Sequence, residues 1–266
     1  MSASKQKYVL VTGAASGMGR SYACQLACMG YGVVAVDRDE AALQRLMKEL
    51  TACSQAAHRA LVLDLSLVDA AEQLMAQLAH IESDIEVLIC NAGVLAFGGF
   101  SALTEERIAT VISLHITTHT KLIHRIGTMM RCHSRGYILW VSSATAWMAY
   151  PSIALYAATK NFVKMLSEAL HDEWAQDGVV VTVVCPGAVD TPFYRLDKRM
   201  RGWLLRMGVM LTPDEVARRA LRALFKGRKR LLPGLAAKGM AWVGWFLPSW
   251  LIRRVVRIER VRRLLM

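Results

Sequence analysis

Short apolar runs, rich in β-branched residues, alternate along this chain with longer segments of helical pattern. Such runs are typical of strands that are buried on both faces, and the alternation predicts a parallel sheet covered by helices on both sides. Right-handed crossovers then give a doubly wound, Rossmann-like α/β fold. The predicted strands are 8–11, 33–36, 60–63, 86–90, 137–141 and 179–184, and the predicted helices are 18–29, 40–53, 68–81, 105–132 and 153–176.

The positive charge of the chain is concentrated near its C-terminus. The 266 residues carry a formal net charge of +12, yet residues 1–194 contain 14 Lys and Arg against 17 Asp and Glu. Residues 195–266 contain 19 against 4. With 54% hydrophobic residues, the chain is too apolar for global disorder. The basic C-terminal quarter therefore needs an explanation separate from the rest of the fold.

The start of the chain and its cysteines indicate a reducing compartment. Residues 1–7 are polar, and the apolar run that follows is too short for a secretory signal. The six cysteines lack the paired spacing of a zinc site, so no metal is predicted. Cys28, Cys90 and Cys185 lie in apolar or strand-like stretches and are predicted to be buried free thiols. We therefore expect a cytoplasmic location.

A glycine-rich turn follows the first predicted strand and opens the first helix. It reads Thr-Gly-Ala-Ala-Ser-Gly-Met-Gly over residues 12–19, and its glycines allow a pyrophosphate to approach the N-terminus of the helix. Asp37 ends the second strand, where a carboxylate accepts both hydroxyls of an adenosine ribose and repels a 2′-phosphate. NAD is thus favoured over NADP, although the adjacent Arg38 is able to hold a 2′-phosphate.

Tyr156 and Lys160 are four residues apart, on one face of the fifth predicted helix. A nearby ammonium favours a phenolate and lowers a tyrosine pKa from about 10 towards the range of a general acid or base. Ser143 precedes Tyr156 by 13 residues and follows a strand at the edge of the sheet where parallel sheets bind ligands. Its hydroxyl is suited to polarise a carbonyl or to hold an alcohol oxygen.

These motifs together resemble the short-chain dehydrogenase/reductase family, and the resemblance runs from about Tyr8 to Thr191. It implies that Tyr156 donates or accepts the proton, that Lys160 also binds the nicotinamide ribose, and that Ser143 orients the substrate oxygen. The positions assigned to the dinucleotide, by the glycine turn or by the resemblance, are Gly13, Ser16, Gly17, Met18, Gly19, Asp37, Arg38, Asp64, Leu65, Asn91, Gly93, Tyr156, Lys160, Pro186, Gly187, Val189 and Thr191.

His115 occupies the position where the family usually has a fourth catalytic residue, an asparagine that holds a water. Histidine also binds water through either ring nitrogen, but it adds a titration near pH 6.5. The alternatives are a working substitute, a slower enzyme, a protein that keeps fold and cofactor without turnover, or a histidine that only packs in its helix. Because Ser143, Tyr156 and Lys160 are intact, we favour the working substitute and place His115 among the catalytic residues.

The loops expected beside the substrate contain large apolar residues and favour a hydrophobic alcohol or ketone. They are Val94, Leu95, Phe97, Trp147, Met148, Tyr150, Phe193, Tyr194 and Trp203.

Beyond these loops, Thr212 and Pro213 open a predicted helix that continues to about Lys226, and the strand predicted after it is expected at an edge of the sheet. A last helix begins near Ser249, and its apolar stripe, tryptophans and arginines are typical of a helix on an anionic membrane. The alternative is that this helix packs on its own domain or on a second subunit. No nucleic-acid-binding module accompanies the charge, so a nucleic-acid partner is not predicted.

We thus predict a single domain in three parts: a dinucleotide-binding catalytic core (1–194), substrate-side helices with the last strand (195–234) and a basic amphipathic C-terminal extension (235–266) that contains the helix predicted from Ser249. The predicted function is NAD(P)-dependent interconversion of a hydroxyl and a carbonyl on a hydrophobic, lipid-, steroid- or retinoid-like substrate at the cytoplasmic face of a membrane. The alternative is a non-catalytic NAD-binding sensor or scaffold. The resemblance further implies a homodimer or a homotetramer.

Overall fold

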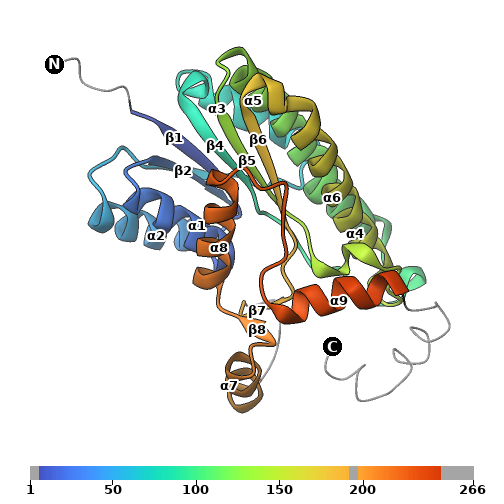
Figure 1. Ribbon diagram of the computed structural model, residues 1–266. Helices are drawn as coiled ribbons and strands as arrows, with labels where there is room; N and C mark the ends of the chain where they lie inside the picture. Colours follow the sequence, from blue (N-terminus) through green and yellow to red (C-terminus); the bar gives the residue numbers. More distant parts are fainter. Residues whose placement is uncertain (1–5, 192–196, 247–266) are drawn as a thin grey trace.

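The computed structural model describes residues 6–191 and 197–246. A seven-stranded sheet in the order β3-β2-β1-β4-β5-β6-β9 lies at its centre (Figure 1). All of its neighbouring strands pair in parallel, which confirms the doubly wound fold. The strands are β1 (Tyr8–Thr12), β2 (Gly32–Asp37), β3 (Arg59–Val62), β4 (Ile85–Cys90), β5 (Gly136–Val141), β6 (Val179–Val184) and β9 (Arg230–Leu231).

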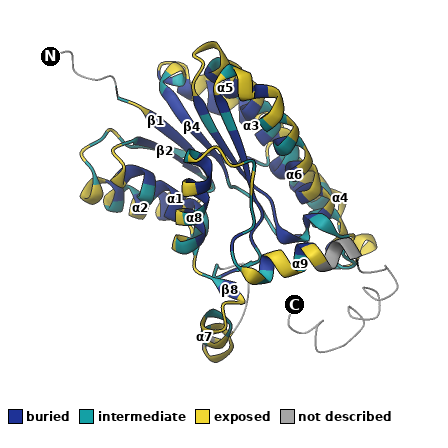
Figure 2. Ribbon diagram, in the orientation of Figure 1, coloured by how far each residue is buried: buried dark blue, intermediate teal, exposed yellow. Residues whose placement is uncertain are grey.

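Helices cover both faces of this sheet (Figure 1). Successive side chains of a strand point to opposite faces, so Tyr8 and Leu10 of β1 join one apolar core while Val9 and Val11 join the other. The first core is closed by α3 (Ala70–Leu78), α5 (Thr118–Cys132) and α6 (Ala154–Trp174), and the second by α1 (Gly17–Cys28), α2 (Glu40–Cys53) and α8 (Pro213–Phe225). Figure 2 shows the central strands as the most deeply buried part of the molecule.

The single helix predicted over 105–132 is interrupted. It consists of α4 (Glu105–Ile112), a π-helical turn η3 (Ser113–Thr117) and α5. Residues 113–117 contain neither proline nor glycine, so the interruption has no local sequence signal. π-Turns of this kind are frequent at functional sites, and this one carries His115.

The C-terminal part adds short elements around the carboxyl ends of the strands. In addition to α8 and β9, they are β7 (Ala188–Val189), α7 (Lys198–Arg206), β8 (Met210–Leu211) and α9 (Leu235–Phe246). The predicted start of α8 is confirmed, because the Thr212 hydroxyl accepts a hydrogen bond from the Glu215 backbone N–H at 3.2 Å. The helix predicted from Ser249 lies outside the described residues. Within them, no helix has the length and apolar character needed to cross a membrane.

The prediction of a free, buried thiol at Cys28 is wrong. Cys28 is exposed at the end of α1 and forms a disulfide with Cys53, the last residue of α2. The two helices lie on the same face of the sheet and end close together, which brings the two Cα atoms to 5.8 Å although 25 residues separate them in the chain. Cys90 and Cys185 are buried and free, as predicted.

The disulfide closes a loop that contains β2, and closing such a loop restricts the unfolded chain. We expect Cys53→Ser to lower the free energy of unfolding by about 3 kcal/mol in urea titrations under non-reducing conditions. Cys132→Ser, which removes an exposed free thiol, is the matched control and should change little. Equal stability of the wild type and Cys53→Ser would contradict the bond.

Candidate active site

A groove of about 340 Å³ opens at the carboxyl ends of β1 and β4. The strand order reverses between these two strands, which is where open parallel sheets bind ligands. Of the residues predicted to hold the dinucleotide, those that line the groove are Gly13, Ser16, Gly17, Met18, Asp37, Arg38, Asp64, Leu65, Asn91, Gly93 and Thr191.

Sequence reasoning also missed part of the groove. Leu63 and Ser66 directly flank the predicted Asp64–Leu65 pair, and Ala92 lies between the predicted Asn91 and Gly93. These three residues could therefore have been predicted from their position next to residues already assigned. Thr110 and Leu114 come from α4 and η3, where no sequence motif marks them. The predicted positions that are not among the lining residues are Gly19, Tyr156, Lys160, Pro186, Gly187 and Val189.

The glycine turn is built on close backbone approaches. A Cβ atom at residue 19 would lie 1.9 Å from the carbonyl oxygen of Gly13, so only glycine fits there. Gly13 and Gly17 have φ angles of +62° and +51°, a region that favours glycine. The first turn of α1 contains no acidic residue, and its N-cap Ser16 makes no side-chain capping bond. The backbone N–H groups of this helix end therefore suit the pyrophosphate of a dinucleotide.

Thr12 and Asn91 fix the glycine turn to the end of β4. The Asn91 side-chain amide donates to the carbonyl oxygens of Thr12 and Gly13 at 3.0 and 3.1 Å. The Thr12 hydroxyl in turn accepts from the backbone N–H groups of Asn91 and Ala92 at 2.9 and 3.1 Å. The polar atoms of Asn91 thus support the backbone of the turn as well as lining the groove.

Asp37 and Arg38 both line the groove, but the Asp37 side chain is held by hydrogen bonds and the Arg38 side chain is largely exposed. The Asp37 carboxylate accepts hydrogen bonds from the backbone N–H groups of Ala15 and Asp39, at 3.0 and 3.2 Å, so it is held in place. Arg38 is 69% exposed and lies 3.6 Å from the carboxylate of Asp64. A fixed carboxylate and a partly neutralised guanidinium therefore share this end of the groove.

Ser143 follows the end of β5, Tyr156 and Lys160 lie on α6, and hydrogen bonds join the strand end to the helix. The Ser142 hydroxyl donates to the carbonyl oxygen of Lys160 at 2.6 Å, and the Lys160 ammonium donates to the carbonyl oxygen of Val141 at 3.0 Å. That ammonium lies 5.7 Å from the centre of the Tyr156 ring. Burial lowers the pKa of Lys160 to about 8. Ser143 follows β5 by two residues, and its hydroxyl accepts from the backbone N–H of Thr145 at 3.2 Å.

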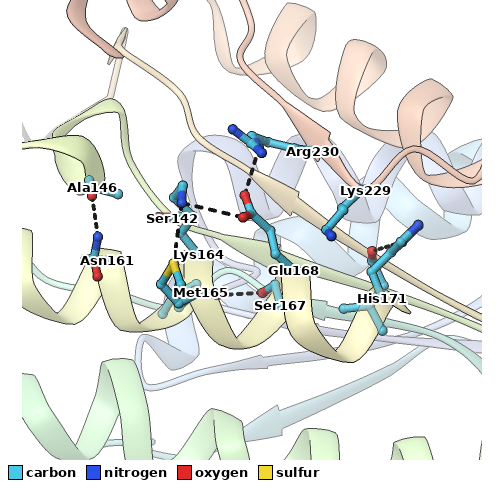
Figure 3. A network of polar contacts seen from close by, with 12 residues as sticks. Ser142, Ala146, Asn161, Lys164, Met165, Ser167, Glu168, His171, Lys229 and Arg230 are labelled. Carbon is cyan, nitrogen blue, oxygen red and sulfur yellow. Dashed lines mark hydrogen bonds and ion pairs between the residues drawn. The ribbon is translucent and has the colours of Figure 1, made fainter. Parts of the chain in front are cut away.

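A polar network along α6 holds the neighbouring elements in place (Figure 3). Asn161 donates to the carbonyl oxygen of Ala146 at 2.6 Å, which fixes the 3₁₀ turn η4 (Ala144–Trp147) that follows Ser143. Two turns further, Glu168 accepts from Lys164 at 3.5 Å and from Arg230 of β9 at 2.7 Å. The helix that carries Tyr156 is therefore anchored to β9 and to the turn after Ser143.

His115 is buried, and both of its ring nitrogens contact protein groups. Nε2 accepts from the backbone N–H of Val94 at 2.9 Å, so the ring proton is on Nδ1, which lies 2.9 Å from the Thr159 hydroxyl. That hydroxyl donates to the carbonyl oxygen of Tyr156 at 2.8 Å. Burial, with the nearby positive charge of Lys160, holds the pKa of His115 well below its usual value. The ring is thus neutral, and neither nitrogen is left for the water that we expected it to bind.

The residues predicted for the substrate side are dispersed. Val94 lines the dinucleotide groove. Trp147 lies between two cations, 5.1 Å from the Lys164 ammonium and 5.8 Å from the Arg230 guanidinium. Trp203 is 54% exposed on α7. Phe193 and Tyr194 lie outside the described residues.

Comparison with known families decides the class of protein. The family model described as short chain dehydrogenase matches residues 7–201. The chain belongs to this family. It is therefore an NAD(P)-dependent oxidoreductase of the short-chain dehydrogenase fold, as the glycine turn and the Ser143, Tyr156 and Lys160 pattern predicted.

Several curated relatives of this short-chain dehydrogenase have lipid or steroid names. It is 29% identical over 196 residues to the very-long-chain 3-oxoacyl-CoA reductase-A of Danio rerio, covering 72% of this chain and 61% of that protein. It is 29% identical over 218 residues to the 17-beta-hydroxysteroid dehydrogenase type 3 of Rattus norvegicus, covering 81% of this chain and 68% of that protein. This chain thus spans about two thirds of the length of these relatives.

Solved structures share the fold over nearly the whole chain. A 7beta-hydroxysteroid dehydrogenase superposes with a TM-score of 0.85 at 24% identity, covering 94% of this chain and 96% of that one. A short-chain dehydrogenase from Sphingobium yanoikuyae, in complex with NADPH, gives a TM-score of 0.78 at 30% identity, covering 90% and 92%.

Because His115 is neutral and buried, the free energy of unfolding should depend on pH. Its pKa is near 6.5 in the unfolded chain and well below that in the folded protein, so acidification through pH 6.5 protonates the unfolded chain first and destabilises the fold. We expect the wild type to lose about 1 kcal/mol per pH unit below 6.5 more than His115→Asn does, in urea titrations from pH 7.5 to 5.

The matched control is His124→Asn, which removes an exposed histidine from α5. It should follow the wild type across the same pH range. Parallel pH dependence of the wild type and His115→Asn would contradict a neutral, buried His115.

Proposed function

We propose that this enzyme interconverts a secondary alcohol and a ketone on a hydrophobic lipid or steroid, with Tyr156 as the general acid or base. One observation carries the proposal: the buried Lys160 ammonium lies 5.7 Å from the Tyr156 ring, on the helix fixed to the strand end that bears Ser143. The names of the relatives, a very-long-chain 3-oxoacyl-CoA reductase and a 17-beta-hydroxysteroid dehydrogenase, support an apolar substrate.

In the direction of reduction, the Tyr156 hydroxyl gives its proton to the substrate oxygen as that oxygen becomes an alcohol, and in oxidation the phenolate takes the proton back. The Lys160 cation favours the phenolate electrostatically, because it is desolvated and close to the ring. Ser143 donates to the same substrate oxygen and holds it near Tyr156. A nicotinamide dinucleotide, when bound, accepts or supplies the hydride.

His115 acts in this proposal as a positioning residue. Its Nδ1–H holds the Thr159 hydroxyl, which in turn bonds to the Tyr156 carbonyl oxygen, while Nε2 holds the Val94 backbone beside Gly93. The histidine thereby links the first turn of α6 to the loop that lines the dinucleotide groove. In this proposal, direct hydrogen bonds of His115 between these two segments replace the water that the asparagine of the family holds.

We also propose NAD as the preferred dinucleotide. The Asp37 carboxylate is fixed by two backbone N–H groups and is suited to accept from ribose hydroxyls, whereas a 2′-phosphate would meet its negative charge. Arg38 has Asp64 as a competing partner, which weakens its attraction for a 2′-phosphate.

Tyr156→Phe tests the catalytic role. We expect kcat to fall by about 10²- to 10⁴-fold on a panel of hydrophobic alcohols and ketones, because the proton has no donor or acceptor at this position. Dinucleotide affinity, measured by fluorescence titration, should stay within a few-fold of the wild type. Tight dinucleotide binding without Tyr156-dependent turnover would favour the non-catalytic sensor instead.

Asp37→Ala tests the choice of dinucleotide. The ratio of Kd values for NADPH and NADH should move towards NADPH by about tenfold or more, since the repulsion of the 2′-phosphate is removed. Glu40→Gln removes an exposed acid three residues away and serves as the control. An unchanged ratio in Asp37→Ala would refute the assignment of Asp37.

A further inference from the structure

A strongly basic groove lies away from the dinucleotide site, between α8 and the segment that runs from β9 into α9. Its volume is about 530 Å³. The lining residues that the structure describes include no acid. Six of them are basic: Arg219, Arg222, Lys226, Arg228, Arg230 and Lys238.

Two of these cations are already neutralised. Arg219 pairs with Glu215 on its own helix, and Arg230 pairs with Glu168 of α6 at 2.7 Å (Figure 3). In residues 6–191 and 197–246, no acid pairs with the others, which are Arg222, Lys226, Arg228 and Lys238. The groove therefore keeps a charge that only a partner from outside the described fold can balance.

The basic groove continues into an exposed apolar face of α9. Leu235 and Trp242 are 83% and 67% exposed, and their spacing places them on the same side of the helix as Lys238. Leu235 and Lys238 also line the groove. Exposed leucine and tryptophan beside a row of cations are typical of surfaces that lie in the interface of a bilayer.

We propose that this groove and the outer face of α9 form a docking surface for an anionic phospholipid bilayer. The cations of the groove contact lipid phosphates, and Leu235 and Trp242 enter the boundary between headgroups and acyl chains. A symmetric contact with a second copy would bring like charges together and is disfavoured. Residues 247–266, outside the described part, contain six arginines and one glutamate, so the sequence that follows α9 is also basic.

The position of this surface gives it a use, which rests on the proposed function. α9 packs against η4, the turn that follows Ser143, and a Cβ atom at Gly187 would lie 3.5 Å from Ala237 of α9. A bilayer bound to α9 is thus separated from the Ser143 end of the site by a single helix. A hydrophobic substrate dissolved in that bilayer has a short path to the site.

The test is co-sedimentation of the full chain with vesicles in 0.1 M NaCl. The double variant Arg222→Glu with Lys226→Glu should bind vesicles of phosphatidylcholine with 30% phosphatidylserine at least tenfold more weakly than the wild type. Raising NaCl to 0.5 M should weaken wild-type binding by a similar factor, because exposed charges are screened.

The matched control is Arg45→Glu with Lys48→Glu, an equal change of charge on exposed positions of α2. It should lower binding by less than threefold, and circular dichroism checks that both variants fold. Equal loss in the two double variants would show only a net-charge effect and would overturn the proposal. A second result would also overturn the proposal. If Arg222→Glu with Lys226→Glu binds vesicles as strongly as the wild type but loses affinity for inorganic pyrophosphate, the groove binds a soluble phosphate ligand instead.

Trp242→Phe tests the apolar part of the surface. Vesicles that contain brominated lipid should quench the tryptophan fluorescence of the wild type clearly more than that of Trp242→Phe, since bromine quenches only indoles at its depth. Equal quenching would contradict insertion of α9. Vesicle binding is measured without substrate, so its failure is distinguishable from a failure of the Tyr156→Phe assay.

Discussion

The site depends on how the carboxyl ends of β1 and β4 are joined. The two strands are neighbours in the sheet, but the chain leaves them on opposite sides, so a groove opens between their ends. Thr12 and Asn91 exchange four hydrogen bonds across this point, including those to Gly13 and Ala92. These bonds satisfy part-buried backbone groups at the two strand ends, and they hold the glycine turn against the loop after β4.

A second constraint is electrostatic. Lys160 is buried on α6 with a pKa of about 8, and its positive charge lies near His115, whose own pKa is held well below its usual value. Two neighbouring cations in a desolvated space would be unfavourable. The lysine therefore carries the positive charge, and the neutral histidine makes hydrogen bonds. In the mechanism that we propose, this division gives proton transfer to one helix, α6, and leaves His115 to fix the position of that helix.

The regular elements followed from local pattern, and the irregular ones did not. The limits of α2 and β6 agree residue for residue with the prediction, because an N-cap with apolar periodicity and a β-branched run are local signals. The π-turn at His115 has no such signal, and the partners of that histidine, Val94 and Thr159, are distant from it in sequence. The Cys28–Cys53 bond and α9 were missed for related reasons: the first depends on where two helices end, and the second lacks a polar stripe. Most residues of the dinucleotide groove were predictable, because one motif places several of them at once.

The basic residues around β9 also affect whether two molecules of the protein can aggregate through their sheet edges. Among the described residues, β9 is the outermost strand on its side of the sheet, and an outer strand edge is a site where another extended chain can pair. Lys229 and Arg230 are paired with Asp172 and Glu168 of α6, whereas Arg228, just before the strand, pairs with no acid in the described residues. The charge of Arg228 thus serves the basic groove and also opposes the approach of a second such edge, so removing it should make the protein less soluble as well as less adhesive.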